Sequence, residues 1–423
     1  MLEHILHLKC TICGREYAPQ DIDYVCPRHG NEGIVDVRYD YDLVGQRIGK
    51  QQLKESDDFT MWRYKPLLPV SADAEVPPLA VGWTPMYKTP RLARDLGLDH
   101  LWVKDDGRQP TASFKDRASA VAIVKAREQG AEIITTASTG NAAAALSGLC
   151  ASMAQANVIF VPVTAPQAKI AQLLVFGSTV MLVQGTYDNA FELCLEAAAE
   201  YGWYNRNTGY NPYMTEGKKT ASLEICEQLG WEAPDAIFVS VGDGCIIGGL
   251  HKGLKDLVAL GWIDHMPRLY GIQSSGSDWM MQAWEEDADL LAKAPIEANT
   301  VADSISAGLP RDRIKAMAAV KETNGAYIRV FDEDILAAIP ALARGSGVFA
   351  EPAGATAYAG LVQAVEQGLV GRDERIVVLN TGNGLKDITS AMKAVDLVQT
   401  TPYHVEPRLD ALQEILAGQL TAA

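Results

Sequence analysis

The chain has little of several features that mark particular classes of protein. Only 7 of its 423 residues are cysteine, which is too few for a disulfide scaffold. It has no uninterrupted apolar run of about 18 residues, the length that spans a membrane. Its first ten residues lack the basic start and continuous apolar stretch of a secretion signal. We therefore expect a cytoplasmic location and no membrane partner.

Basic residues are also in short supply. Lys and Arg number 37 against 53 Asp and Glu, which gives a formal charge of −16. This charge repels phosphate backbones, so we expect no nucleic-acid partner. The chain is 48% apolar and 21% charged, as suits a large packed core. At roughly 100–200 residues per domain, its length predicts two or three domains.

Short β-rich runs alternate with Ala-rich helical segments. This alternation predicts an α/β fold with parallel sheets covered on both faces. Strands are predicted over residues 101–103, 132–136, 157–163, 179–183, 236–241, 268–273 and 375–379. Helices are predicted over residues 117–129, 141–154, 187–201, 216–229 and 247–260. The last 25 or so residues are expected to form a helix packed on the body or a mobile tail.

Three of the cysteines lie close together near the N-terminus. Cys10, Cys13, Cys26 and His29 have the spacing C-x2-C-x12-C-x2-H, which is typical of a tetrahedral zinc ribbon. Three thiolates and an imidazole would close the site, so the metal would be structural. The alternative is a turn that holds reduced thiols and no metal.

Lys115 lies at the predicted start of a helix, within Ser-Phe-Lys-Asp-Arg. The positive end of the helix dipole and burial behind Phe114 would both lower the pKa of its amine. A free amine is what a Schiff base or a general base needs. The alternative is a surface lysine paired with Asp116.

Three further segments follow predicted strands, where open α/β sheets bind ligands. Residues 138–141 read Ser-Thr-Gly-Asn, a helix start that offers N–H groups to a carboxylate or phosphate. Residues 242–249 form a glycine-rich turn that suits a phosphate, without the pattern of a nicotinamide or triphosphate site. Residues 381–387 read Thr-Gly-Asn-Gly-Leu-Lys-Asp. Each segment alone could be an ordinary helix cap or turn.

In this order, the four segments resemble the pyridoxal-phosphate enzymes of the tryptophan synthase β fold (fold type II), and within them the threonine synthases. Further matches are Gly82-Trp83-Thr84-Pro85, residues 169–173, Asn211-Pro212, residues 216–220 and Glu351-Pro352. The N-terminal cysteine pairs resemble the zinc-ribbon-like extension of some threonine synthases. The resemblance implies two doubly wound α/β sheet domains and a homodimer. The extension would cover residues 1–60, the catalytic body 61–397, with a smaller mobile domain at about 100–210, and a tail 398–423.

The resemblance also implies roles for individual residues. Lys115 would be the Schiff-base lysine and the acid/base of the reaction. The other cofactor contacts would be Phe114, Asn141 at the 3-oxygen, Thr381 at the pyridine nitrogen, and the turn Gly242, Asp243, Gly244, Cys245 and Ile246 at the phosphate. The substrate carboxylate would be bound by Ser138, Thr139 and Gly140.

Two departures from the family pattern lie where threonine synthases bind the phosphate group of their substrate. Ala142 stands where threonine synthases commonly have a hydroxyl residue, and Met214 where they commonly have an arginine. Each lost charge-assisted contact costs about 1.5–3 kcal/mol. The residues expected to replace these contacts are Lys104, Lys218, Arg206 and Lys219. Ala112, in place of a glycine beside the lysine, predicts a different backbone path.

The expected function is therefore that of a pyridoxal-phosphate lyase, converting O-phospho-L-homoserine and water into L-threonine and phosphate. One alternative is a relative that acts on another amino acid, as cysteate synthase or threonine dehydratase does. Another is a protein that binds the cofactor without catalysis.

Overall fold

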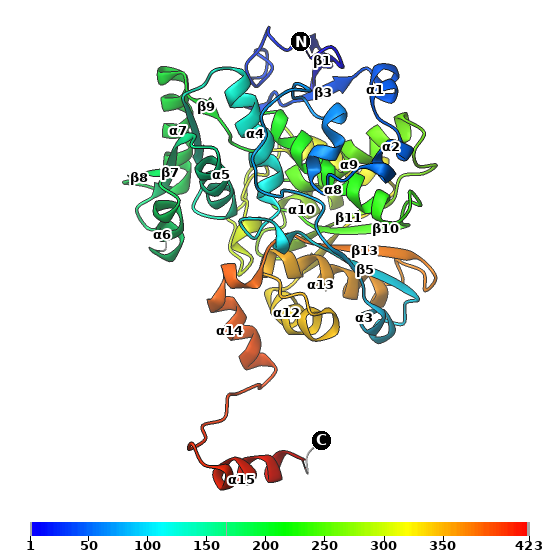
Figure 1. Ribbon diagram of the computed structural model, residues 1–423, viewed down its shortest axis with the longest axis vertical. Helices are drawn as coiled ribbons and strands as arrows, with labels where there is room; N and C mark the ends of the chain where they lie inside the picture. Colours follow the sequence, from blue (N-terminus) through cyan, green and yellow to red (C-terminus); the bar gives the residue numbers. More distant parts are fainter. Residues whose placement is uncertain (1, 166, 421–423) are drawn as a thin grey trace.

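Two sheets covered by helices make up the body of the structure (Figure 1). The computed structural model describes residues 2–165 and 167–420. The larger sheet has the strand order β12-β11-β10-β13-β5-β4, and its strands are parallel except for β4 at the edge. These strands are β4 (Met86–Lys88), β5 (His100–Asp105), β10 (Ala236–Ser240), β11 (Arg268–Ser274), β12 (Ala326–Val330) and β13 (Arg375–Asn380).

Both faces of the larger sheet are buried, as its nearly continuous apolar strands require. In β10, Ile237 and Val239 pack on one face and Phe238 on the other. The first face is covered by α4 (Lys115–Glu128), α8 (Tyr213–Gln228), α9 (Cys245–Ala259) and α11 (Arg313–Glu322). The second face is covered by α3 (Pro90–Asp95), α12 (Asp332–Ser346) and α13 (Pro352–Glu366). A short helix, α10 (Trp279–Glu285), follows β11.

The smaller sheet is wholly parallel, in the order β8-β7-β6-β9. Its elements are β6 (Ile133–Ala137), α5 (Asn141–Ser152), β7 (Ala156–Pro162), α6 (Gln167–Val175), β8 (Thr179–Val183), α7 (Tyr187–Tyr201) and β9 (Tyr204–Asn205). The smaller domain was expected from about residue 100, but β5 pairs with β13 in the larger sheet. The smaller sheet therefore begins at β6.

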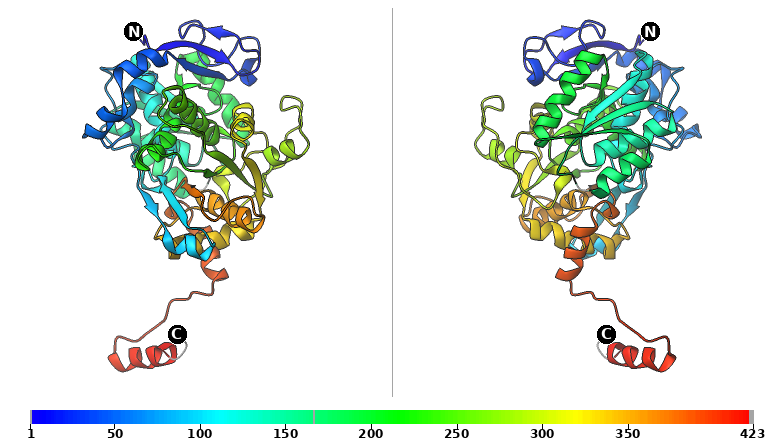
Figure 2. Two further views of the ribbon diagram at one scale, coloured as in Figure 1. Left: turned by 90° about the vertical axis from the view of Figure 1, so that its right-hand side faces the viewer. Right: turned by 90° about the vertical axis from the view of Figure 1, so that its left-hand side faces the viewer.

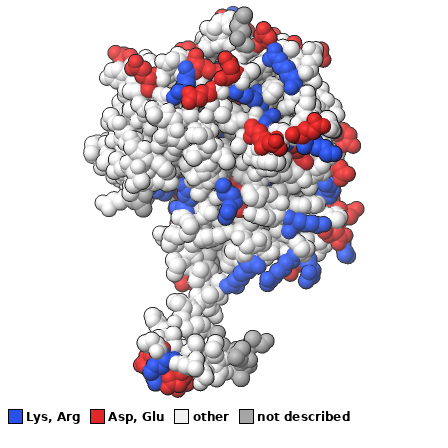
Figure 3. Space-filling view, in the orientation of Figure 1, with Lys and Arg blue, Asp and Glu red and all other residues white. Residues whose placement is uncertain are grey.

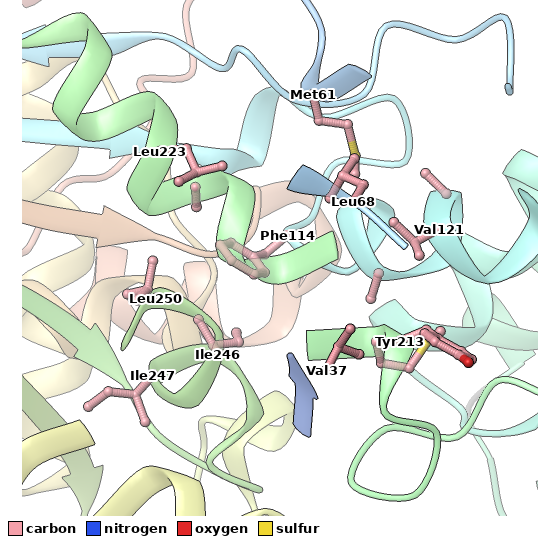
Figure 4. Packing of buried hydrophobic residues seen from close by; sticks show 14 of the residues in the cluster. Val37, Met61, Leu68, Phe114, Val121, Tyr213, Leu223, Ile246, Ile247 and Leu250 are labelled. Atoms are coloured by element: carbon pink, nitrogen blue, oxygen red, sulfur yellow. The ribbon is translucent and has the colours of Figure 1, made fainter. Parts of the chain in front are cut away.

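The N-terminal extension packs on the same core as the body. It contains the antiparallel strands β1 (Ile5–Cys10), β2 (Glu16–Tyr17) and β3 (Val35–Tyr39), followed by α1 (Tyr41–Arg47) and α2 (Lys50–Glu55). Figure 4 shows Val37 of β3 near Tyr213 of α8 and Ile246 of α9. The hydroxyl of Tyr39 donates to Glu216 Oε2 at 2.7 Å. The extension is thus anchored to the helix that follows the smaller domain.

The C-terminal helix α15 (Leu409–Leu420) stands apart from the body in all three ribbon views (Figures 1 and 2). It follows α14 (Ile388–Leu397), which adjoins the larger domain. A helix was one of the two forms predicted for this segment, but its packing on the body is not what the structure shows. No helix in the described ranges is long and apolar enough to cross a membrane.

A fully buried ion network joins the start of α4 to α8. Glu224 accepts from Lys104 Nζ at 2.7 Å and from Arg117 Nη1 at 2.5 Å, and Arg117 also bonds Asp106. The prediction that Lys104 binds substrate is therefore corrected, since its amine is held by Glu224, Gln228 and the carbonyl of Thr84. The network fixes the orientation of α4, the helix that begins with Lys115.

Replacing Glu224 by glutamine is expected to lower the free energy of unfolding by about 3–5 kcal/mol, because it leaves the buried Lys104 without a carboxylate and Arg117 with Asp106 alone. Burial would raise the pKa of Glu224, but Arg117 and Lys104 outweigh it and lower that pKa to about 2. The stabilisation is present above the unfolded pKa, about 4.3, and is lost as the pH falls towards 2. Urea unfolding at pH 7 measures the loss, with the exposed Glu366→Gln as control. Equal midpoints for the two variants would contradict the prediction.

Candidate active site

Lys115 is held at the start of α4 by the loop that follows β13. The N–H of Phe114 donates to the carbonyl of Thr381 at 2.9 Å, and the N–H of Asn383 donates to the carbonyl of Ala112 at 3.0 Å. Ala112 has a φ of +65°, in the left-handed region that glycine favours. The different path expected for Ala112 is therefore not seen, since the alanine adopts a glycine-like conformation.

The side chain of Lys115 is half-buried, and its amine is unpaired. Its pKa is lowered chiefly by burial, against the opposing charge of Glu351. Asp116, the alternative partner, instead accepts from the N–H and the hydroxyl of Thr111. Within the described part of the chain, Lys115 forms no ion pair and its Nζ no hydrogen bond. This environment favours the free amine over a surface ammonium.

The Ser-Thr-Gly-Asn turn lines a cavity of 440 Å³ between the two domains. Thr139, Gly140 and Asn141 form one wall, and Glu351 lies at the start of α13 on the other. Asn141 Nδ2 donates to Glu351 Oε1 at 2.7 Å. Burial raises the pKa of Glu351 to about 7, although Lys115 and Asn141 oppose the shift. Sequence reasoning did not select Glu351 as a site residue; its one signal was the Glu-Pro match.

The glycine-rich turn between β10 and α9 has the shape of a phosphate cradle. Gly244 has a φ of +85°, and a Cβ there would lie 2.6 Å from the Cβ of Ala316. A Cβ on Gly242 would lie 2.7 Å from the backbone of Ile305. Both positions therefore need glycine. The turn leads into the first N–H groups of α9, which begins at Cys245 and offers them to an anion.

Two buried cations lie near Lys115. Arg206 follows β9 and is 1% exposed; its Nε donates to Ser119 Oγ at 3.1 Å, and its Nη2 has no hydrogen-bond partner among the described residues. Burial lowers the pKa of Arg206 to about 10. Lys218, on α8, donates to Thr208 Oγ1, and burial together with the charges of Arg206 and Lys115 lowers its pKa to about 8.

No carboxylate forms an ion pair with either cation in the ranges that the structure describes. Asp116 acts electrostatically on Arg206 and Asp312 on Lys218, but without an ion pair two buried positive charges stay costly unless a further anion joins them. The other candidate, Lys219, is already paired with Glu216 and Asp256 at 2.5 and 2.7 Å. Of the predicted phosphate-binding cations, the structure thus leaves Arg206 and Lys218 available.

The structure also places four other residues that the sequence analysis selected. Met214 is 1% exposed and belongs to the hydrophobic core. Phe114, predicted as a cofactor contact, is also a core side chain, as Figure 4 shows, and it adjoins the site through its backbone. Ala142 is half-buried in the first turn of α5. Thr381 is buried at the end of β13, beside the loop that carries Lys115.

The cysteine cluster lies in the extension, away from this cavity. One ligand atom from each of Cys10, Cys13, Cys26 and His29 lies within 4.8 Å of the others. His29 Nδ1 is 3.8 Å from the sulfur of Cys10 and 3.5 Å from that of Cys26. These separations match the edges of a tetrahedron with metal–ligand bonds of about 2.0–2.3 Å.

Lys115, at the start of α4, lies close enough to the glycine-rich turn for Asp243 and Cys245 to act on its charge, an arrangement that suits an enzyme using pyridoxal phosphate. The family model "Pyridoxal-phosphate dependent enzyme" matches residues 78–382. Tomato (Solanum lycopersicum) threonine deaminase isoform 2 superposes with a TM-score of 0.64 at 24% identity, covering 75% of this chain and 88% of that one. Diaminopropionate ammonia lyase of Escherichia coli gives 0.63 at 16% identity, over 88% and 94%. These likenesses support the fold.

Sequence relatives specify the family further. Threonine synthase of Methanocaldococcus jannaschii is 35% identical over 96% of this chain and 98% of its own length. That of Methanosarcina acetivorans is 37% identical, over 98% and 99%. The chain therefore belongs to the threonine synthase family of pyridoxal-phosphate-dependent enzymes.

Proposed function

We propose that the chain converts O-phospho-L-homoserine and water into L-threonine and phosphate. The observation that carries the proposal is the pair of buried cations without ion pairs in the described structure, Arg206 and Lys218, beside Lys115. A phosphorylated amino acid brings the negative charge that this pair lacks. The full-length similarity to threonine synthases supports the same reaction.

The residues present fit pyridoxal phosphate. The turn at Gly242 and Gly244 leads into the first N–H groups of α9, which suit a phosphate, and the amine of Lys115 is near this turn and has no partner in the described structure. When bound, the cofactor withdraws electrons from the amino acid attached to it. A hydroxyl such as that of Thr381 does not hold the pyridine nitrogen protonated as a carboxylate does. A cofactor whose pyridine nitrogen is not held protonated withdraws electrons less strongly. Weaker electron withdrawal suits an elimination in which the leaving group departs promptly.

In the proposed reaction, Lys115 attaches the cofactor and, as a free amine, takes protons from Cα and then Cβ of the substrate. The N–H of Ser138 donates to the carbonyl of Phe160 at 3.1 Å and that of Gly140 to Ser138 Oγ at 3.2 Å, so the N–H of Thr139 and the hydroxyls of this turn would bind the substrate carboxylate. The C–O bond at Cγ breaks, and the phosphate leaves with its electron pair towards the cations. A proton is then added at Cγ, water adds at Cβ and gives up one proton to the phosphate or solvent, and a proton finally returns to Cα. Closure of the smaller domain keeps other water away until that step.

The alternative of a different amino-acid substrate rested on the missing contacts at Ala142 and Met214. Arg206 reaches the site from β9 and Lys218 from α8, so they supply charge of the required sign from other positions. A substrate without a phosphate would leave both cations buried and unpaired. The phosphorylated substrate is therefore favoured over a hydroxy amino acid.

The test is phosphate release from O-phosphohomoserine by the purified holoenzyme, with the amino acid identified in the same sample. We expect equal amounts of phosphate and threonine. A holoenzyme that releases no phosphate would contradict the proposal, and assays with O-phosphoserine and L-threonine would then identify the substrate. The predicted homodimer and cytoplasmic location stay predictions; light scattering measures the first.

We also propose that the cysteine cluster binds structural zinc. Its four ligand atoms converge, and a set of three thiolates and an imidazole suits this metal. Zinc would stabilise the extension, which contacts strand β9. The hydroxyl of Tyr24 accepts a hydrogen bond from the N–H of Asn205 in that strand, next to Arg206. The role of the metal would be to hold the extension in place.

Removing zinc with a chelator is expected to speed amide hydrogen exchange over residues 5–39 and to raise the KM for the phosphorylated substrate, because the Tyr24 contact is lost. The visible absorbance of the cofactor should persist, since its predicted ligands lie outside the extension. Exchange mass spectrometry and absorbance measure both effects, with Cys150→Ser, a buried thiol outside the cluster, as the control for zinc content. Loss of the cofactor together with the metal would contradict the separation of the two sites.

A further inference from the structure

A second cavity, of 360 Å³, lies between the N-terminal extension and the body. Its walls come from the turn after β1, from β3, and from α9 and α11. It contains none of the residues assigned to the cofactor or the substrate, although α9 borders both places. Its volume is in the range of small-molecule sites.

The lining of this cavity is positively charged in an acidic protein. Five cations line it against two carboxylates, whereas the whole chain has a formal charge of −16. The face shown in Figure 3 has acidic and basic side chains mixed over the upper and right-hand parts and few on the smaller domain at the left. The cations of the cavity are Lys9, Arg38, Lys252, Lys255 and Lys315, and the carboxylates are Asp36 and Glu322.

The two carboxylates are shared and do not satisfy the cations around them. Asp36 lies 3.4 Å from Arg38 and 3.5 Å from Lys315, and Glu322 lies 3.1 Å from Lys255. Lys252 bonds Asp256, which also pairs with Lys219. Lys9 pairs with Glu16 at 3.1 Å. Glu16 and Asp256 do not line the cavity, so the walls themselves present five cations and two carboxylates.

Two buried N–H-bearing atoms in the lining lack an acceptor. Arg38 Nε has no hydrogen-bond partner in the described structure. The same holds for Nε2 of His251, whose side chain is 4% exposed; it is 3.2 Å from Glu322 but outside hydrogen-bond geometry. Both atoms are buried, so an anion in the cavity would reach them only after these side chains turn; it would first meet the side chains of the lysines and of Arg38.

We propose that this cavity is a second anion site, which binds a small phosphate ester. A phosphate offers acceptors to Arg38 and the lysines at once, and its charge matches the excess of cations on the walls. The site does not depend on the proposed reaction. Helix α9 begins next to Gly244 of the glycine turn, and His251 lies further along it. A ligand in the cavity would therefore contact the same helix whose first turn is proposed to bind the cofactor phosphate.

Calorimetric titration of glycerol 3-phosphate into the holoenzyme at low ionic strength tests the proposal. We expect saturable binding with a Kd below about 1 mM. The double variant Arg38→Gln, Lys255→Gln should weaken it about tenfold or more. Both side chains are partly exposed, at 40% and 33%, so the variant is expected to fold. Lys9→Gln, also 40% exposed, provides a second, independent variant.

Lys321→Gln is the matched control, because Lys321 lies on α11 but pairs with Asp287 and does not line the cavity. It should bind as the unmodified protein does. Absence of binding, or equal affinity in the cavity variants and the control, would overturn the proposal. Binding that is lost in Arg206→Met but kept in the cavity variants would place the ligand in the catalytic site and overturn it too.

Discussion

Replacing Lys115 by alanine is expected to abolish turnover, with kcat reduced by about 10³-fold or more, and to remove the visible absorbance of the bound cofactor. Lys115 carries the unpaired amine at the start of α4, and its lowered pKa favours the form that attaches the cofactor and accepts protons. Borohydride reduction followed by peptide mass analysis measures the attachment directly.

Lys125→Ala on the same helix is the matched control, because Lys125 pairs with Glu128 at 2.9 Å, far along α4 from the cavity. It should keep both turnover and absorbance. A Lys115→Ala protein that still gives a cofactor-labelled peptide, or retains the absorbance, would show that another lysine attaches the cofactor. The phosphate cradle at Gly242–Ile246 is untouched by the substitution, so loss of colour would report the lysine itself.

The second large effect concerns Arg206. Arg206→Met is expected to lower kcat/KM for O-phosphohomoserine by about 10- to 150-fold, which corresponds to about 1.5–3 kcal/mol for one charge-assisted contact. The thermal midpoint should stay the same or rise, because Arg206 is buried without an ion-pair partner in the described part of the free enzyme. Binding of threonine, which has no phosphate, should change little. A fall in stability together with equal losses for both ligands would indicate a structural role.

The pH dependence gives a further check on the same pair. The lowered pKa of Lys218, about 8, means that its ammonium is lost as the pH rises through that value. Because kcat/KM reports groups of the free enzyme, it should fall above about pH 8 for the phosphorylated substrate. In Lys218→Arg the guanidinium stays charged, so this alkaline limb should move upward. An unchanged profile would exclude Lys218 from phosphate binding.

Much of the fold could be predicted from the sequence. Strands β5, β6, β7, β8, β10, β11 and β13 were predicted as apolar runs between turn signals, and the predicted fold and family are confirmed. Strands β4 and β9 were missed because they have only three and two residues, and β12 because Arg329 interrupts a run of only five residues. The strands of the extension were missed as well, because the cysteine spacing was read as a metal motif and gave no strand pattern of its own.

The parts of the site that escaped prediction depend on contacts between distant residues. Lys104 looked like a candidate ligand because it ends a strand, but its partner Glu224 lies on α8 and no local pattern shows the pairing. Conversely, nothing near Glu351 in the sequence reveals that it meets Asn141. Arg206 was one of four equivalent cations in the sequence. Arg206 differs from Lys104 and Lys219 in that it forms no ion pair with a carboxylate in the described structure, a difference that tertiary packing determines.

The position of β13 has a consequence for the order in which the chain can fold. This strand lies in the middle of the larger sheet, between β5 and β10, yet it is the last strand along the chain. During synthesis the smaller sheet, contained within residues 133–205, can form as soon as it emerges from the ribosome. Strand β5 can pair with β4 early, but it must wait for β13 on its other side. Such long-range pairing slows folding. The nascent chain therefore carries an incomplete larger domain, with exposed strand edges, until translation is nearly finished.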